Sequence, residues 1–188
     1  MVAGVLLGCA ACASSASGPV PDARASTAAT TLTAAASTGP FTLTRGQGFD
    51  QSGAFIPLMT CDDPKDYSPG LEFANVPAGT AELALTMVDL DVQKIHWLQL
   101  GIPAGTRGIT AHRLVPGARE ALNDFGETTY TGPCPPPGTT HRYRLTLYAL
   151  REPVPSSSDS STPPAQTLKE IERRAFASAA LVAPYTRH

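Results

Sequence analysis

The chain has 188 residues, with 14 Lys and Arg, 16 Asp and Glu, and a formal net charge of −2. Its isoelectric point is near 6.0, and Lys and Arg gather nowhere, so the sequence lacks the basic surface with which proteins bind nucleic acids or anionic membranes. Nucleic acid is therefore not a predicted partner. A chain of this length is expected to form one domain with a sizeable core.

Residues 1–12 have the features of an export signal: they are apolar, rich in small side chains and too short to span a bilayer as a helix. Leu6 to Cys9 resemble a bacterial lipobox, which makes Cys9 the predicted lipidation site. The usual basic residues before such a stretch are missing, and cleavage at a nearby alanine without a lipid is the alternative. We expect an exported protein, either a lipoprotein on the outer face of the cell membrane or a secreted one.

Residues 13–40 are mostly Ala, Ser and Thr. Such a segment buries too little apolar surface to offset the entropy lost on ordering. We expect a flexible tether that would hold a folded domain, residues 41–188, away from the membrane, with the lipid anchor as the only membrane contact.

Short strands and turns open this domain. Residues 41–44 alternate as a strand does, residues 51–57 predict a second short extended piece, and residues 71–73 predict a third. Residues 59–70 are dense in Asp, Pro, Ser and Gly, which predicts a loop with several turn-forming side chains.

Three longer strands follow, at residues 81–91, 95–102 and 141–149, each with the two-residue alternation of a half-buried strand. The apolar rows are Leu83, Leu85 and Met87; Leu98, Leu100 and Ile102; and Leu145, Leu147 and Ala149. Each row ends in one ionisable side chain, namely Asp89, His96 or His141. Three such ends predict a common site at one edge of a two-sheet core.

A rigid loop precedes the last of these strands. Prolines 135, 136 and 137 fix their φ angles and lack N–H donors, which excludes a helix or a sheet interior. Directly after this loop, His141 and Tyr143 stand at the mouth of an apolar face, where they are placed to line a pocket. For Tyr143, an ordinary core tyrosine with a satisfied hydroxyl is the alternative.

The last segment predicts a helix over residues 166–180, where Leu168, Ile171 and Phe176 fall at helical spacing, and then a short strand at 181–183. The chain has many strands, one late helix and no alternation of strands with helices. We therefore expect an all-β fold, a two-sheet antiparallel β-sandwich with a peripheral C-terminal helix.

The two histidines and Asp89 carry the predicted chemistry. An imidazole near a carboxylate has its charged form favoured, and two such donors together with loop N–H groups can hold an oxyanion. Asp89 would then orient one imidazole. Two histidines and one aspartate could also ligate a metal ion, but their spacing matches no known motif, so neither a metal nor a cofactor is predicted.

Several short motifs occur in a particular order: TCDD, SPGL, VPAGT, LALTMVDLDV, HWLQLGIPAGT, NDFG, YTGPCPPPG and HRYRLTLYAL. Each motif is weak alone, but the order, over residues 41–187, resembles the phosphatidylethanolamine-binding protein family in its bacterial branch related to Raf kinase inhibitor proteins. The resemblance implies a β-sandwich with a small pocket for anions such as phosphate, phosphorylated head groups or acetate.

The resemblance also implies which residues form the pocket region. The positions that match family motifs are Asp89 and Asp91 (D-P-D-x-P), His96 (the pocket histidine), Gly132, Cys134 and Pro135 (G-x-x-P-P), and His141, Arg142 and Tyr143 (H-R-Y). The chain departs from the family at Leu90 and Gln93, which replace two prolines, at Gly70, which replaces another, and at Lys94, where a tryptophan is usual. We therefore expect a more open or more basic pocket rim.

The predicted ligand-binding residues are Asp89, His96, Gly132, Cys134, Pro135, His141 and Tyr143. Two pairs have predicted structural roles. Arg142 lies on the opposite face of the strand from His141, so we expect it to form a structural ion pair with Asp91 there.

The family brings the loops of Cys61 and Cys134 to the pocket side, and an exported location permits a disulfide between them. Two free buried thiols are the alternative. A nucleophilic Cys134 would make an enzyme, but no nucleophile motif accompanies it.

These features predict a non-catalytic exported binding protein whose small anion pocket takes phosphate-, phospholipid-head-group- or carboxylate-like ligands. The alternative is an extracytoplasmic inhibitor or regulator of a partner protein such as a peptidase. A hydrolase is disfavoured because the sequence has neither a nucleophile elbow nor a zinc signature.

Overall fold

The computed structural model describes residues 39–156 and 160–188. They belong to one compact unit, Ala35–His188. The predicted export signal, the lipidation site Cys9 and the predicted tether as far as residue 38 lie outside the described residues.

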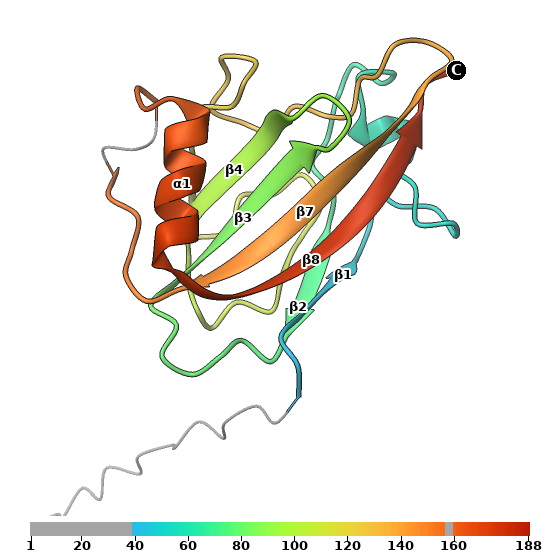
Figure 1. The fold of residues 1–188 in the computed structure, drawn as a ribbon. Coiled ribbons are helices and arrows are strands. Elements are labelled where there is room, and N and C mark those ends of the chain that lie inside the picture. Colours follow the sequence, from blue (N-terminus) through green and yellow to red (C-terminus); the bar gives the residue numbers. More distant parts are fainter. Residues whose placement is uncertain (1–38, 157–159) are drawn as a thin grey trace, which may run out of the picture. The chain divides into compact units, whose positions relative to one another are not determined.

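The described residues form two antiparallel sheets (Figure 1). The smaller sheet has the strand order β1 (Thr42–Arg45), β2 (Leu71–Ala74) and β5 (Gly108–Ile109). The larger sheet has the order β6 (Arg119–Glu120), β4 (Lys94–Ile102), β3 (Glu82–Asp89), β7 (Thr140–Leu150) and β8 (Ala175–Thr186). The helices are the 3₁₀ turn η1 (Pro57–Met59) and α1 (Pro164–Arg174). The predicted β-sandwich with one peripheral helix is confirmed.

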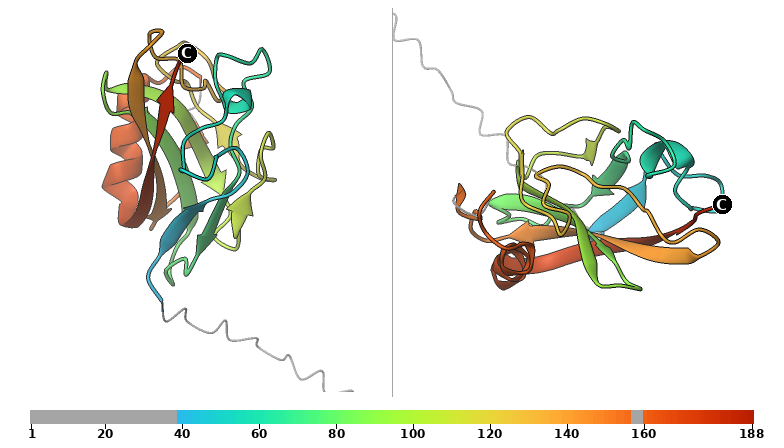
Figure 2. Two further views of the ribbon diagram at one scale, coloured as in Figure 1. Left: turned by 90° about the vertical axis from the view of Figure 1, so that its right-hand side faces the viewer. Right: turned by 90° about the horizontal axis from the view of Figure 1, so that it is seen from above.

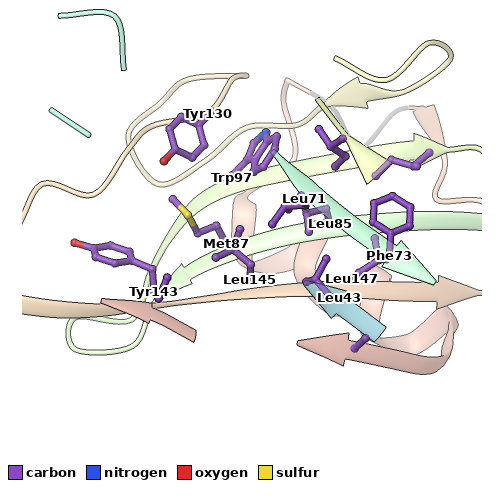
Figure 3. Packing of buried hydrophobic residues seen from close by; sticks show 14 of the residues in the cluster. Leu43, Leu71, Phe73, Leu85, Met87, Trp97, Tyr130, Tyr143, Leu145 and Leu147 are labelled. Atoms are coloured by element: carbon purple, nitrogen blue, oxygen red, sulfur yellow. The ribbon is translucent and has the colours of Figure 1, made fainter. Parts of the chain in front are cut away.

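The two sheets face each other, and α1 covers the outer face of the larger sheet (Figure 2). The main core lies between the sheets, where side chains of both are buried (Figure 3); it includes Leu43, Leu71, Phe73, Leu85, Met87, Trp97, Leu145 and Leu147. A second cluster joins the helix to the sheet and includes Ile171, Leu168, Leu98, Leu100 and Val88. Within the described part of the chain, no helix is long and apolar enough to cross a membrane.

The predicted alternation is confirmed in β3 and β7, whose apolar rows both face the core between the sheets. In β4 the predicted single row is wrong: Leu98 and Leu100 face the helix, whereas Ile102 faces the other sheet. The reason is that the pairing of β4 with β3 shifts register at two places. Each β-bulge adds one residue to β4 and so changes the face on which the following side chains lie.

Two other expectations are corrected. Residues 51–57 form no strand; the described backbone there has an isolated bridge between Phe49 and Phe55 and then enters η1. The predicted helix is right only in its first half, because Ala175 onward forms β8, which pairs with β7 along its whole length. Alanine favours helix, but the edge of β7 offers a hydrogen-bonding ladder, and Ala179 and Ala183 become buried on it. Tertiary contacts therefore override local preference.

Candidate functional site

The three ionisable row ends predicted from the sequence meet at one end of the larger sheet. The turn from β3 to β4 and the start of β7 lie where β8 ends, at the upper right of Figure 1, because Asp89 pairs with both Lys94 and Tyr143 and Thr140 pairs with Thr186. A pocket of about 230 Å³ opens here, lined by Asp89, Val92, Lys94, His96, Phe125, Cys134, Pro136 and His141. We call it the imidazole pocket.

Asp89 holds the His141 ring in place. His141 Nδ1 lies 2.7 Å from Asp89 Oδ2, and Asp89 is only 2% exposed. The other oxygen, Oδ1, accepts hydrogen bonds from the backbone N–H groups of Asp91 and Val92, at 2.9 and 3.3 Å. Because an ionised carboxylate only accepts, Nδ1 carries the proton. His141 Nε2 is thus the ring nitrogen left for a ligand.

His96 reaches the same pocket through the β-bulge in β4. Met87 pairs with Trp97 but Val88 pairs with Ile95, so His96 is the extra residue and leaves the row that faces the helix. Its Nδ1 lies 2.8 Å from the Thr131 carbonyl oxygen, which can only accept, and therefore Nδ1 is protonated here as well. Burial lowers the pKa of His96, against the opposing effects of the Thr131 carbonyl and the Asp89 carboxylate. The neutral ring presents the lone pair of Nε2.

Tyr143 lies behind the two imidazoles and does not line the pocket. Its ring meets His96 edge to face with centroids 5.2 Å apart, and it lies 6.5 Å from the His141 ring. Its hydroxyl is buried and makes no hydrogen bond of normal geometry. Burial and the nearby Asp89 carboxylate raise its pKa. Tyr143 is therefore a core residue that supports the pocket.

The wall of the pocket is the segment before β7, and a neighbouring loop braces it. Cys61 and Cys134 form the predicted disulfide, with Cα atoms 5.4 Å apart, and the Cys61 N–H donates to the Pro133 carbonyl oxygen over 3.2 Å. The Gly132 N–H donates to Asp66 Oδ2 over 2.9 Å, so it is not free to bind an anion.

Gly132 and Pro135 are buried and lie outside the pocket lining. A Cβ atom on Gly132 would come within 2.6 Å of the Met59 carbonyl oxygen and closer still to Asp66 Oδ1. Glycine is therefore required here for close packing of the two loops. Gly132 shapes the wall rather than contacting a ligand.

Arg142 points away from the pocket. Its guanidinium lies 2.9 Å from Asp91 Oδ1, and its backbone N–H donates to Asp91 Oδ2 over 2.7 Å. Hydrogen bonds from Arg142 lower the pKa of Asp91. The predicted ion pair is present, but the Arg142 side chain is 61% exposed, so the pair is a surface contact.

Several lining residues were not expected from the sequence as binding residues: Val92, Phe125 and Pro136. Phe125 reaches the pocket because the buried Asn123 shapes its loop. Asn123 Oδ1 accepts from the N–H groups of Phe125 and Glu127, at 2.9 and 3.1 Å. The sequence Asn123-Asp124-Phe125-Gly126 is typical of a turn. It predicted a loop here but not that the loop lies beside the pocket.

The rim also carries Lys94, whose ammonium nitrogen lies 4.9 Å from the centroid of the Phe125 ring. The expected basic residue thus lies at the rim. Across residues 39–156 and 160–188, no group of three or more His, Cys, Asp or Glu side chains is arranged to hold a metal ion.

The fold and the arrangement of these motifs agree with the family comparison. The chain belongs to the phosphatidylethanolamine-binding protein family, whose model matches residues 48–186. It is 38% identical over 138 residues to a Mycobacterium tuberculosis protein named "Putative lipoprotein LppC", with 71% of this chain and 67% of the relative covered. It is 35% identical over 130 residues to the UPF0098 protein of Aquifex aeolicus, with 65% and 73% covered.

Solved structures show the same fold. Escherichia coli YbcL, described as a member of the mammalian PEBP family, superposes with a TM-score of 0.69 at 24% identity, covering 79% of this chain and 99% of YbcL. A phosphatidylethanolamine-binding protein homologue from Chlamydia trachomatis superposes with a TM-score of 0.68 at 26% identity, covering 79% and 98%.

Proposed function

We propose that this protein is a non-catalytic, exported binding protein whose imidazole pocket holds a small anion, such as phosphate, a phospholipid head group or a carboxylate. One observation carries the proposal: His96 and His141, from different strands, line one pocket, and each has its Nδ1 engaged by an acceptor. Only the Nε2 atoms remain, and protonated imidazoles would offer two N–H donors to an oxyanion.

The surroundings of the imidazoles fit a small ligand. Lys94 adds a positive charge at the rim, and Val92 and Phe125 are 53% and 41% exposed beside it. These apolar side chains can contact the carbon atoms next to an anionic group. At about 230 Å³ the pocket is below the range of about 300–1,000 Å³ that is usual for drug-sized ligands. It therefore favours a head group or an inorganic anion over a whole lipid.

The absence of catalysis and the export are parts of the same proposal. Cys134, the nucleophile considered from the sequence, is held in a disulfide and has no thiolate to offer. A disulfide is typical of exported proteins, and one relative carries the name lipoprotein. Both support a location on the outer face of the cell membrane, as a lipoprotein, or in the medium.

An NMR titration of the purified protein with phosphate, phosphoethanolamine and acetate tests the proposal. We expect saturable shifts of the His96 and His141 imidazole resonances with at least one of these anions. His141→Gln should weaken binding by about tenfold, the loss expected for one charge-assisted hydrogen bond. Arg142→Gln is the control and should bind as the wild type does. If no anion moves either imidazole resonance, the protein is not an anion-binding module of this kind.

A further inference from the structure

A second pocket, of about 340 Å³, lies between the loop of residues 65–68, the segment 112–114 and strand β4. Its volume is within the range of about 300–1,000 Å³ for ligand pockets. Thr129 and Tyr130 line it, whereas Cys134 and Pro136, a few residues farther on, line the imidazole pocket. The two pockets share no lining residue, so this one needs a separate explanation.

Two partly buried carboxyl groups, of Asp66 and Glu120, line this pocket. Asp66 Oδ2 accepts one hydrogen bond from Gly132, and Oδ1 is buried with no donor. Glu120 Oε1 accepts from the Trp97 indole N–H over 2.7 Å. Among the described residues neither carboxyl has a cationic partner. Burial raises the pKa of both Asp66 and Glu120, which is the result of removing carboxylates from water without pairing them.

Aromatic rings lie beside these carboxyl groups. Trp97 and Tyr130 both line the pocket and meet edge to face with ring centroids 5.3 Å apart; Figure 3 shows them together at one end of the core. Trp97 and Tyr130 are only 1% and 6% exposed, so their ring faces are covered and a ligand meets the carboxyl groups in front of them. The buried rings keep water away from one side of the carboxyl groups, which strengthens the attraction of these groups for an ammonium group.

The rim of the same pocket has the opposite charge. Lys65, His112 and Arg113 line it and are exposed. Within the described residues, neither Lys65 nor Arg113 forms an ion pair; the Lys65 ammonium lies 5.7 Å from the Tyr67 ring centroid. A simple cation would be repelled by this rim and a simple anion by the acidic part below it. A ligand that carries both charges would satisfy both parts.

We propose that this pocket is a second binding site, for a small zwitterion such as an amino acid. Its ammonium group lies against Glu120 and Asp66, and its carboxylate reaches Lys65 and Arg113. The proposal goes beyond the anion-binding function and does not depend on it, because the two pockets have no residue in common.

Trp97 is the only tryptophan in the chain, so its fluorescence and its indole N–H resonance report directly on this pocket. The full chain is titrated with glycine, β-alanine and γ-aminobutyrate, which differ in the distance between their charges, and with ethylammonium and propionate, which carry one charge each. We expect a saturable change with at least one amino acid, and binding at least about tenfold weaker for both single-charge compounds.

Variants at the exposed rim and at the acidic part complete the test. Lys65→Met and Arg113→Met remove exposed charges without disturbing the core, and each should weaken binding of the amino acid several-fold. Glu120→Gln keeps an acceptor for the Trp97 indole but removes the negative charge, and should also weaken it. Lys169→Met, a matched exposed lysine on α1, should not. The proposal is overturned if no amino acid gives a saturable Trp97 response, if ethylammonium or propionate binds as tightly, or if the rim variants bind like the wild type.

Discussion

His141 donates a hydrogen bond from Nδ1 to Oδ2 of Asp89, 2.7 Å away, although the two residues are 52 positions apart in the chain. The contact joins the start of β7 to the end of β3 and fixes which nitrogen of the ring faces the imidazole pocket. The carbonyl oxygen of Thr131 fixes the His96 ring in the same way, because it accepts a hydrogen bond from Nδ1 and leaves Nε2 for the pocket. Both rings therefore have to be protonated before both can donate to an anion.

Sulfate binding is expected to strengthen as the pH falls. Burial lowers the pKa of His96, so its ring is neutral at pH 7, and sulfate brings no proton of its own. Binding must then take up a proton, which strengthens the affinity by up to about tenfold per pH unit as the pH decreases from about 7.5 toward 5.5. Calorimetric titrations over this range measure the effect.

His96→Gln is the matched variant for this prediction, because an amide can donate at any pH. It should bind sulfate with a weaker pH dependence than the wild type, whereas His112→Asn, which changes a histidine of the second pocket, should keep the wild-type dependence. Equal sulfate affinity at both ends of the pH range would contradict the assigned roles of the ring nitrogens.

The same histidine should make stability depend on pH. The pKa of His96 is lower in the folded protein than in the unfolded chain, where it is about 6.5. Its contribution is complete above about pH 6.5 and is lost as the pH falls toward the folded value, because the unfolded state binds more protons there. Urea unfolding at several pH values should show this loss in the wild type and a smaller one in His96→Gln. If the free energy of unfolding falls equally with pH in both proteins, His96 does not make this contribution.

Lys94 and Arg142 should differ in their effect on the ligand although both are cations near the β3–β4 turn. Lys94 lines the imidazole pocket, whereas Arg142 pairs with Asp91 outside it. Lys94→Gln should weaken phosphate binding by about threefold to tenfold, as for one partly screened charge, and reduce its salt dependence. Arg142→Gln should change neither. An equal loss in both variants would show that only overall charge matters.

Gly132→Ala should destabilise the protein and weaken anion binding together. The added Cβ would lie 2.6 Å from the Met59 carbonyl oxygen, and backbone atoms cannot move away without shifting the pocket wall. We expect a loss of about 2 kcal/mol or more in the free energy of unfolding. Gly105→Ala is the control, because a Cβ there meets nothing within 4 Å. Wild-type stability in Gly132→Ala would mean that the two loops are not packed as described.

Removal of the disulfide should lower stability strongly. The bond joins residues 73 positions apart, which corresponds to about 4 kcal/mol in the chain-entropy model. Cys61→Ser, Cys134→Ser and the double variant should all lose a similar amount in denaturant unfolding, because each breaks the same bond. A double variant that loses clearly more than either single variant would show that the side chains contribute in other ways.

The sequence by itself determined the fold class and, in two of the three long strands, which side chains face the core. The two-residue alternation in β3 and β7 places Asp89 and His141 on the core face and Arg142 on the other, because successive side chains of a regular strand alternate. Turn-forming residues identified the loop of Phe125, and ordered motifs identified the family. These are local properties, which neighbouring residues decide.

Only the tertiary structure decided the rest. His96 leaves the row of Leu98 and Leu100 because β4 bulges against β3, and such a shift depends on pairing with a distant strand. Ala175 to Ala180 become strand rather than helix because the edge of β7 is there to pair with them. Gly132 and Asp66 meet because two loops pack together. Each outcome is set by a contact between segments far apart in the chain, which outweighs the preferences of the residues themselves.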